Sequence, residues 1–399
     1  MNGADSLYMT AQEAAATLSV SPATIYAYVS RGLIRSEAAA DGRNKRYRAD
    51  DIRALKDRRA PLESRAPVES ASPVIMDSAV CLLTPEGPFY RGASAVELSR
   101  KSSFEHVAAL LWNAADNDPF ADNDALPLWN LLVPVITATA GRPFIDRAAT
   151  AMALSGGFDP AAYNGTTAGG AAIGAKALRI LTSLATGTAP SRDPIHRALA
   201  PKSREAADLI RRALVLLADH ELNASTFAAR VAVSTGTSIY DALAAALATL
   251  KGPRHGGASA RAARFLASLP SGSPAEAIKQ LRAEGQRLPG FGHPLYRAAD
   301  PRAVALLQAL EDAGADRRLT RDAVNAARDI AGVDPNVDYA LAVMALHLGL
   351  PHETGLTLFA IGRTAGWTAH AIEQRATETL IRPRARYTGI APRASTNAP

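Results

Sequence analysis

A Pro- and Ser-rich segment near the N-terminus divides this chain into two parts that must fold separately. Residues 61–73, PLESRAPVESASP, show no apolar period of a helix or a strand, which is typical of a linker. The segment separates a small module at residues 1–60 from about 310 residues that are enough for one or two larger domains. The polar residues 390–399 are predicted to form a flexible tail.

The composition favours tightly packed helices. Alanine makes up about a fifth of the chain, whereas aromatic residues make up only 6%. Apolar residues account for 48% and charged residues for 21%, which excludes a wholly disordered chain. We therefore expect a mainly α fold.

The sequence also excludes several classes of protein. No uninterrupted apolar run reaches the roughly 18–20 residues that a membrane span needs. Residues 1–10 lack the pattern of a secretion signal, so we expect a cytoplasmic protein. The single cysteine, Cys81, excludes an internal disulfide framework and a metal cage of several cysteines. The formal net charge of +6 is modest and does not by itself indicate an anionic partner.

The small module begins with two predicted helices joined by a tight turn. Thr10 and Glu13 form a capping box for a helix that runs through Leu18. Ser21 can cap a second helix, with Pro22 at its first position. Two short helices in this arrangement predict a helix-turn-helix.

A small β wing and a last helix are predicted to follow. Residues 33–34 and 46–47 flank the turn residues Asp41 and Gly42, which indicates two short strands. Asp50 is expected to cap a final helix over residues 51–59.

The module resembles the winged helix-turn-helix domains of the MerR and excisionase type over nearly its whole length. The resemblance rests on the order of helix, turn, helix ending in "SRGLI", wing, and "RYRADDI". It implies DNA binding, and the alternative is a helical appendage used for assembly. The residues expected to contact DNA are Thr24, Tyr28 and Arg31 on the second helix, and Arg43, Lys45, Arg46 and Arg48 on the wing.

Three histidines after the linker lie in polar, glycine-bearing segments. They are His220 in "ADHELNAST", His255 in "KGPRHGGAS" and His293 in "GFGHPLYRAADPR". Glycines next to a histidine let the backbone approach a ligand closely. The histidines are far apart in the sequence and no HExxH motif is present, so we predict no metal site. The absence of GxSxG disfavours a serine hydrolase.

The last third of the chain adds a carboxylate and several cations. Asp334 is predicted to cap a helix with Pro335 at its first position, which places Asp338 in the first turn. Arg363 lies within an apolar helix, where a guanidinium needs an anionic partner. One carboxylate base, three histidine donors and several arginines together suit the removal of a proton next to a carbonyl, with a polycarboxylate held by the arginines. More arginines follow near the chain end, at positions 382, 384 and 386.

From Val74 to Gly389 the order of these segments and their amino-acid sequences resemble the citrate synthase family. The resemblance opens at "IMDSAVCLL…YRG…ELSRKSSFEHVAALLW" and becomes dense from "DHELNAST" onward. It implies a homodimer whose chain has a large helical domain at 74–257 and 343–389 and a small domain at 258–342. It also implies the condensation of acetyl-CoA with oxaloacetate to citrate and CoA, without a cofactor.

The resemblance assigns roles to individual residues. Asp338 would remove a methyl proton from the thioester, His255 would hydrogen-bond the thioester oxygen, and His293 would polarise the keto group of oxaloacetate. The residues that would hold the oxaloacetate carboxylates are His220, Arg302 and Arg363, with Arg382 entering from the other subunit, and Arg297 would contact CoA.

Two alternative functions stay open. The segment after the expected base reads "DYALAV", and residues 113–200 diverge from the family, so the acyl pocket leaves 2-methylcitrate synthesis from propionyl-CoA open. The second alternative is a DNA-binding transcription regulator whose synthase-like body senses a metabolite.

Overall fold

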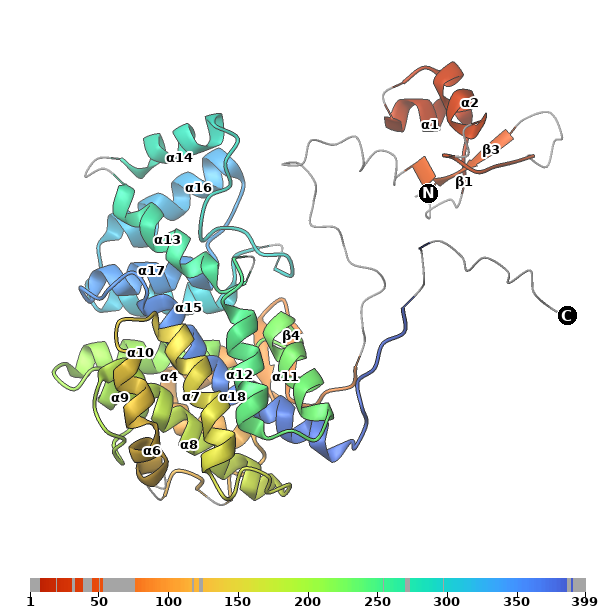
Figure 1. The fold of residues 1–399 in the computed structure, drawn as a ribbon. Coiled ribbons are helices and arrows are strands. Elements are labelled where there is room, and N and C mark those ends of the chain that lie inside the picture. The colour runs from red at the N-terminus through yellow and green to blue at the C-terminus, as the bar shows by residue number, and fades with distance from the viewer. Residues whose placement is uncertain are drawn as a thin grey trace, which may run out of the picture. The chain divides into compact units, whose positions relative to one another are not determined.

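The chain forms two compact units, Met1–Met76 and Asp77–Pro399 (Figure 1). The computed structural model describes residues 8–18, 20–30, 33–38, 45–49, 51–52, 76–116, 118–121, 125–253, 255–269, 273–296, 298–385 and 389. The predicted linker at 61–73, the predicted tail at 390–399, and Arg31, Arg43, Arg297 and Arg386 lie outside these residues.

The first unit contains the two predicted helices, α1 (Ala11–Leu18) and α2 (Pro22–Ser30). The backbone N–H of Thr10 donates to Oε2 of Glu13 at 2.8 Å, and the N–H of Glu13 donates to Oγ1 of Thr10 at 3.3 Å. Ser21 accepts from the backbone N–H of Thr24 at 3.4 Å. Both predicted caps are therefore confirmed, and they explain where the two helices begin.

A three-stranded antiparallel sheet completes the described part of this unit. Its strands β1 (Tyr8–Met9), β2 (Ser36–Ala38) and β3 (Lys45–Arg48) are arranged in the order β1-β3-β2. The wing strand predicted at residues 33–34 starts instead at Ser36, and Ile34 packs in the core of the unit. Strand β1 was not predicted, since two residues carry no period. Of the predicted last helix, the structure describes helical backbone at residues 51 and 52.

The second unit opens with a small antiparallel sheet and is otherwise helical, which confirms the mainly α prediction. Strands β4 (Cys81–Thr84), β5 (Gly87–Tyr90) and β6 (Ala93–Ser94) pair in that order. The next helices are α4 (Ala95–Lys101), α5 (Phe104–Leu111), α6 (Ala125–Ala138), α7 (Phe144–Phe158), α8 (Thr167–Thr186), α9 (Ile195–Leu199), α10 (Arg204–Leu217), α11 (Ala224–Ser234) and α12 (Ile239–Leu250). They are followed by α13 (Gly257–Ser268), α14 (Pro274–Ala283), α15 (Pro301–Asp312), the π-helical turn η1 (Arg318–Asp322), α16 (Ala323–Ala331), α17 (Val337–His347) and α18 (Thr354–Ala376).

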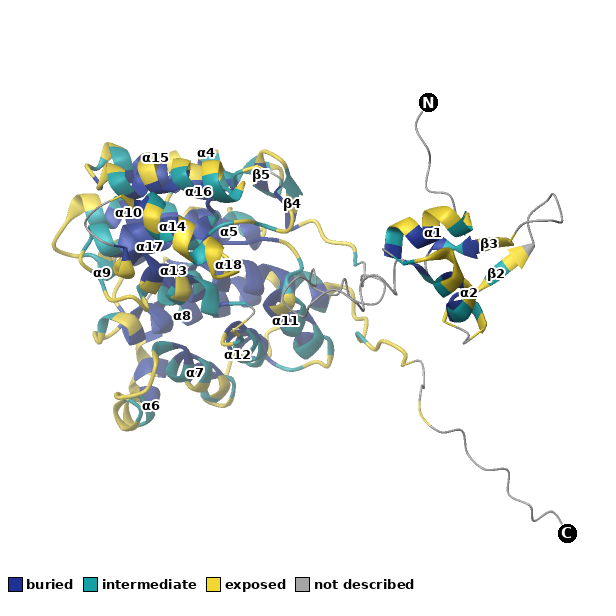
Figure 2. Ribbon diagram, turned by 90° about the horizontal axis from the view of Figure 1, so that it is seen from above, coloured by how far each residue is buried: buried dark blue, intermediate teal, exposed yellow. Residues whose placement is uncertain are grey.

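Helix α18 runs through the core of the second unit. It packs against α8, α10, α11 and α12, and residues 360–371 are all buried. Figure 2 shows the buried residues of this unit in dark blue along its inner helices. Gly174 of α8 permits the close packing, because a Cβ there would collide with Thr368 and Trp112. No helix among the described residues is both long and apolar enough to span a membrane.

Helix α17 begins two residues later than predicted. Its N-cap is Asn336, whose Oδ1 accepts the backbone N–H of Asp338 at 3.0 Å. Asp334 does not cap the helix, because its carboxylate is paired with Arg328 at 2.6 Å, and Pro335 forms a β-bridge with Phe291. Asp338 still lies in the first turn, so the prediction that mattered for the site is confirmed.

Candidate active site

Six of the predicted site residues lie close enough together in the second unit for their charges to interact. The charge of Arg302 acts on His220, His293 and Asp338, and the charge of Arg363 acts on His220 and His255. The six residues come from the turn after α10, the α12–α13 and α14–α15 connections, and the helices α15, α17 and α18: His220, His255, His293, Arg302, Asp338 and Arg363.

His220 and His293 face each other beside Tyr296. Their ring centroids are 5.3 Å apart, and Nε2 of His220 lies 3.1 Å from the hydroxyl of Tyr296. Burial lowers the pKa of His220, and it lowers the pKa of His293 to about 4. The backbone N–H groups of Leu295 and Tyr296 donate to Nδ1 of His293 at 3.1 and 3.3 Å. The neutral ring of His293 therefore carries its proton on Nε2, as a hydrogen-bond donor.

His255 is oriented by a buried serine. Its Nε2 lies 2.8 Å from Oγ of Ser225, which also accepts the indole N–H of Trp367 at 3.2 Å. Burial lowers the pKa of His255 to about 4, so its ring is neutral near pH 7. The hydroxyl of Ser225 donates to Oδ1 of Asn223 at 2.8 Å, and that oxygen also accepts the backbone N–H groups of Ser225 and Thr226 at 3.1 and 3.2 Å. The contact with this fixed hydroxyl holds the His255 ring at Nε2, whereas Nδ1 forms no hydrogen bond with a described residue.

The carboxylate of Asp338 accepts a hydrogen bond from the hydroxyl of Ser259 on α13. Burial raises the pKa of Asp338, with the Ser259 bond opposing that shift. A carboxylate with a raised pKa is a stronger base once it is ionised. The position of Asp338 near the positive end of α17 favours that ionised form.

Arg302 is held by a neighbouring aspartate. Its side chain is 3% exposed, and its Nε and Nη2 donate to the carboxylate of Asp300 at 3.0 and 2.8 Å. Asp300 caps α15 and also accepts the backbone N–H of Val337 at 3.1 Å. Nη1 of Arg302 forms no hydrogen bond with the residues that the structure describes, so this group is left for a ligand.

Arg363 lies deeper and has no ion pair among the described residues. It is 1% exposed, its Nε donates to the carbonyl of Leu217 at 2.8 Å, and its Cζ lies 4.7 Å from the ring centre of Phe359. A buried guanidinium without a bonded carboxylate is costly. An anionic ligand would relieve this cost.

The structure does not bring Arg382 to these six residues within one chain. Arg382 lies after α18, is exposed, and forms no hydrogen bond or ion pair with any described residue. The described residues also contain no group of three His, Cys, Asp or Glu side chains placed to hold a metal ion.

The predicted DNA contacts are placed unevenly on the first unit. Lys45 and Arg46 are exposed on β3, while the guanidinium of Arg48 lies 5.7 Å from the ring centre of Tyr8. Thr24 is half-buried on α2. Tyr28 is only 8% exposed and packs in the core of the unit, so its assignment to base contact is corrected to a core position. Its neighbour on the outer face of α2 is Tyr26, which is 55% exposed.

Sequence reasoning missed several polar residues around the site. They are short side chains or motif neighbours without a pattern of their own: Ser225, Ser259, Tyr296 and Asp300. All four lie inside the quoted segments, since Ser225 belongs to "ADHELNAST", Ser259 ends "KGPRHGGAS", and Tyr296 and Asp300 belong to "GFGHPLYRAADPR". The motifs marked the segments, and the fold shows that the two serines contact His255 and Asp338.

Residues 146–384 match the family profile "Citrate synthase, C-terminal domain", and residues 8–60 match a "Helix-turn-helix domain". The chain is 41% identical over 191 residues to a citrate synthase of Haloferax volcanii, which covers 46% of this chain and 50% of that protein. It is 30% identical over 338 residues to a 2-methylcitrate synthase of Mycobacterium tuberculosis, which covers 75% of this chain and 84% of that protein. The chain thus spans about half the length of the Haloferax relative that it matches.

Solved structures are similar over most of the chain. The citrate synthase of Thermotoga maritima has a TM-score of 0.65 at 27% identity and covers 81% of this chain and 96% of its own. The citrate synthase of Pyrobaculum aerophilum has a TM-score of 0.69 at 26% identity and covers 82% of this chain and 92% of its own.

Proposed function

Because the chain belongs to the citrate synthase family, we propose that its second unit condenses an acyl-CoA thioester with oxaloacetate and releases CoA. The observation that carries this proposal is the grouping of neutral histidines, two buried arginines and one half-buried carboxylate around the same place. This grouping supplies a base, two neutral donors and two anion-binding side chains, which are the parts that such a condensation needs.

In the first step, the carboxylate of Asp338 removes a proton from the carbon next to the thioester carbonyl. The electron pair of that C–H bond moves into an enolate, whose oxygen accepts a hydrogen bond from His255. Ser225 supports this role, because its contact with Nε2 holds the ring and leaves Nδ1 without a bond to a described residue. A donor aimed at a developing oxyanion commonly contributes about 2.7–4 kcal/mol to lowering a barrier.

In the second step, the enolate carbon attacks the keto carbon of oxaloacetate. The Nε2–H of His293 donates to the keto oxygen, which gains the electron pair of the C=O π bond as the new C–C bond forms and takes the Nε2 proton to become a hydroxyl, while the proton that Asp338 removed returns to the histidine. The two backbone donors at Nδ1 of His293 support this direction of the ring proton. Water then hydrolyses the citryl thioester to citrate and CoA.

Arginines and a histidine hold the carboxylates of oxaloacetate. We assign this role to Arg363 and to the Nη1 of Arg302, with His220 as a neutral donor beside them. Arg382 reaches the same site from a second copy of the chain, so the homodimer is the catalytic unit. Its exposure, and the lack of a bond to any residue that the structure describes in its own chain, support that placement. Arg297 is proposed to contact CoA.

Acetyl-CoA is the proposed acyl donor, and propionyl-CoA is the alternative. Over matched spans of similar length, the identity is 41% across 191 residues to the Haloferax citrate synthase and 35% across 187 residues to a 2-methylcitrate synthase of Shewanella oneidensis, which favours acetyl-CoA. The test offers both thioesters at equal concentration with oxaloacetate and identifies the product by mass spectrometry. Citrate as the main product supports the proposal, and 2-methylcitrate supports the alternative. If neither product forms, the proposed condensation is contradicted.

DNA binding is the second function that we propose, and it belongs to the first unit. It is supported by the helix-turn-helix match and by the exposed cations Lys45 and Arg46 on the wing strand. Fluorescence anisotropy of the full chain with genomic fragments at two salt concentrations tests it. Binding that weakens steeply with salt is expected. No binding at low salt would mean that the unit serves assembly. DNA binding by a chain that condenses no substrate would instead support the metabolite-sensing regulator.

A further inference from the structure

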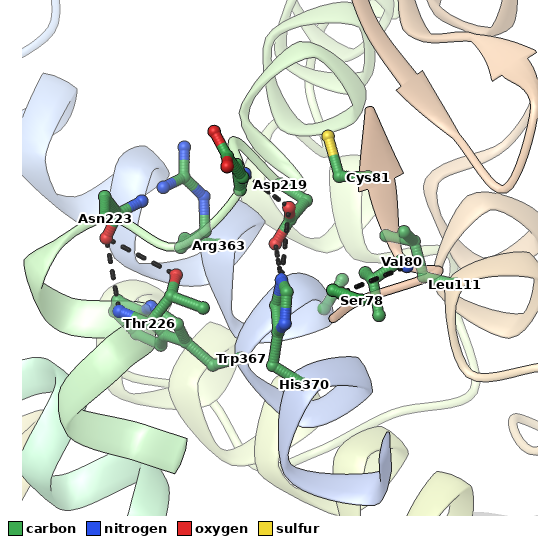
Figure 3. A network of polar contacts seen from close by, with 12 residues as sticks. Ser78, Val80, Cys81, Leu111, Asp219, Asn223, Thr226, Arg363, Trp367 and His370 are labelled. Atoms are coloured by element: carbon green, nitrogen blue, oxygen red, sulfur yellow. Dashed lines mark hydrogen bonds and ion pairs between the residues drawn. The ribbon is translucent and has the colours of Figure 1, made fainter. Parts of the chain in front are cut away.

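We propose that Asp219 is a positioning residue which, together with His370 and Arg230, sets the affinity of the second unit for the dicarboxylate substrate. The proposal rests on the proposed function, since it concerns the same oxaloacetate site. Figure 3 shows Arg363, Trp367 and His370 on one side of α18, with His370 directed at Asp219. None of the catalytic steps above uses Asp219 or His370. Both side chains are fully buried, so their polar groups require an explanation.

His370 is held in one tautomer by Arg230. Nε and Nη2 of Arg230 lie 3.0 and 2.8 Å from Nδ1 of His370. An arginine can only donate, so Nδ1 of His370 must be the acceptor and carries no proton. The ring proton therefore sits on Nε2, which faces the two carboxylate oxygens of Asp219 at 3.3 and 3.4 Å.

Arg230, which holds His370, is itself held by side chains of α18. It is fully buried between α11 and α18, donates to Oε1 of Gln374 at 3.1 Å, and pairs with Glu373. Glu373 in turn accepts the hydroxyl of Ser78 at 2.8 Å. His370 thus lies between a buried cation and a buried anion.

Asp219 shapes the turn that presents His220. Its Oδ1 accepts the backbone N–H of Glu221 at 2.8 Å, and the carbonyl of Glu221 accepts the N–H of Asn223 at 3.0 Å. Glu221 has a φ of 58°, in the left-handed region that side chains rarely adopt. The Asp219 carboxylate stabilises this conformation, and His220 lies between the two residues it links.

Asp219 is also the negative charge that offsets Arg363. Burial opposes ionisation of Asp219, but the bond from His370 and the charge of Arg363 hold its pKa below the usual value. The carboxylate lies close enough to interact electrostatically with Arg363 and forms no ion pair with it within the described part of the chain. Arg363 thus keeps a counter-charge in the empty site and retains its donors for a substrate carboxylate.

The experiment compares full-length variants in oxaloacetate affinity. Asp219→Asn should raise the KM for oxaloacetate about ten-fold or more, while the KM for the acyl-CoA changes less than about two-fold. The matched control is Asp159→Asn, because Asp159 is also buried and bonded, to Tyr240 at 2.8 Å and Lys176 at 3.1 Å, but belongs to no part of the site. Asp159→Asn should lower the thermal midpoint and leave both KM values unchanged.

Two substitutions at His370 test the role without touching the carboxylate. Glutamine can accept from Arg230 and donate to Asp219 in neutral form, so His370→Gln should keep the wild-type KM for oxaloacetate. His370→Leu removes both functions and should behave like Asp219→Asn. If Asp219→Asn does not fold, this pair decides the question. If His370→Gln raises the KM for oxaloacetate as much as His370→Leu does, the proposed role of His370 between Arg230 and Asp219 is overturned.

Isothermal titration of oxaloacetate separates this inference from the proposed function. Wild-type binding that is weakened in Asp219→Asn but not in Asp159→Asn supports the inference even if no condensation is detected. Unchanged oxaloacetate affinity in Asp219→Asn overturns the inference even if condensation is confirmed. Absence of oxaloacetate binding by the wild-type chain overturns both.

Discussion

The carboxylate of Asp219 lies directly against the backbone of Gly366 on α18. The N–H of Gly366 donates to the carbonyl of Ala218 at 2.9 Å, and a Cβ at position 366 would collide with that carbonyl and with Oδ2 of Asp219. The glycine therefore lets a buried helix and the turn of the site touch through main-chain atoms. Any side chain at this position must push the turn away.

Gly366→Ala is expected to destabilise the second unit and to weaken oxaloacetate binding. In an open helix the same change stabilises by about 0.5 kcal/mol, whereas overpacking a buried contact costs about 1–3 kcal/mol. Gly157→Ala on α7 is the matched control, because a Cβ there meets nothing within 4 Å. Chemical unfolding and oxaloacetate titration of both variants test this. Equal effects of the two substitutions would contradict the close approach.

Ser225→Ala should lower kcat by about ten-fold or more and change the KM for oxaloacetate little, because it removes the hydroxyl that holds the His255 ring in place. Thr226→Val is the control, since the hydroxyl of Thr226 contacts Asn223 at 3.4 Å and has no bond to His255. Steady-state kinetics measure the difference. A Ser225→Ala enzyme with a wild-type kcat would show that His255 is oriented by other groups.

The free energy of unfolding should fall as the pH is lowered from about 6.5 toward 4. Burial lowers the pKa of His255 and His293 from 6.5 to about 4, so between these values the unfolded chain binds more protons than the folded chain. Stability therefore rises with pH across this window. Urea unfolding at pH values of about 7 and 5 measures the loss. The double variant His255→Gln, His293→Gln should lose less, and an equal loss would contradict the assignment.

Mixed dimers test whether Arg382 acts across subunits. Arg382→Ala and Asp338→Asn should each impair condensation, and a dimer with one chain of each kind should contain one intact site. Mixing the inactive variants after subunit exchange should therefore restore part of the activity. Dimers that are shown to be mixed, for example by native mass spectrometry, and that stay inactive would place Arg382 outside the partner's site.

The sequence predicted the helical class, the caps of α1 and α2, and the six residues that meet in the second unit, because these depend on local chemistry and on motif order. It placed the start of α17 at Asp334 because a salt bridge to Arg328 cannot be read from spacing. The role of His370 was hidden for the same reason. Its sequence context favours a surface or packing role, and only the fold supplies Arg230 and Asp219 as its partners.

The most direct test of the central claim is a thiol-release assay on the full chain, with and without oxaloacetate, for the wild type and for Asp338→Asn. We predict that the wild type releases CoA from the acyl-CoA only when oxaloacetate is present. Asp338→Asn should release none while still binding oxaloacetate, because the base acts on the other substrate. Release by the wild type without oxaloacetate, or release by Asp338→Asn at the wild-type rate, would contradict the account.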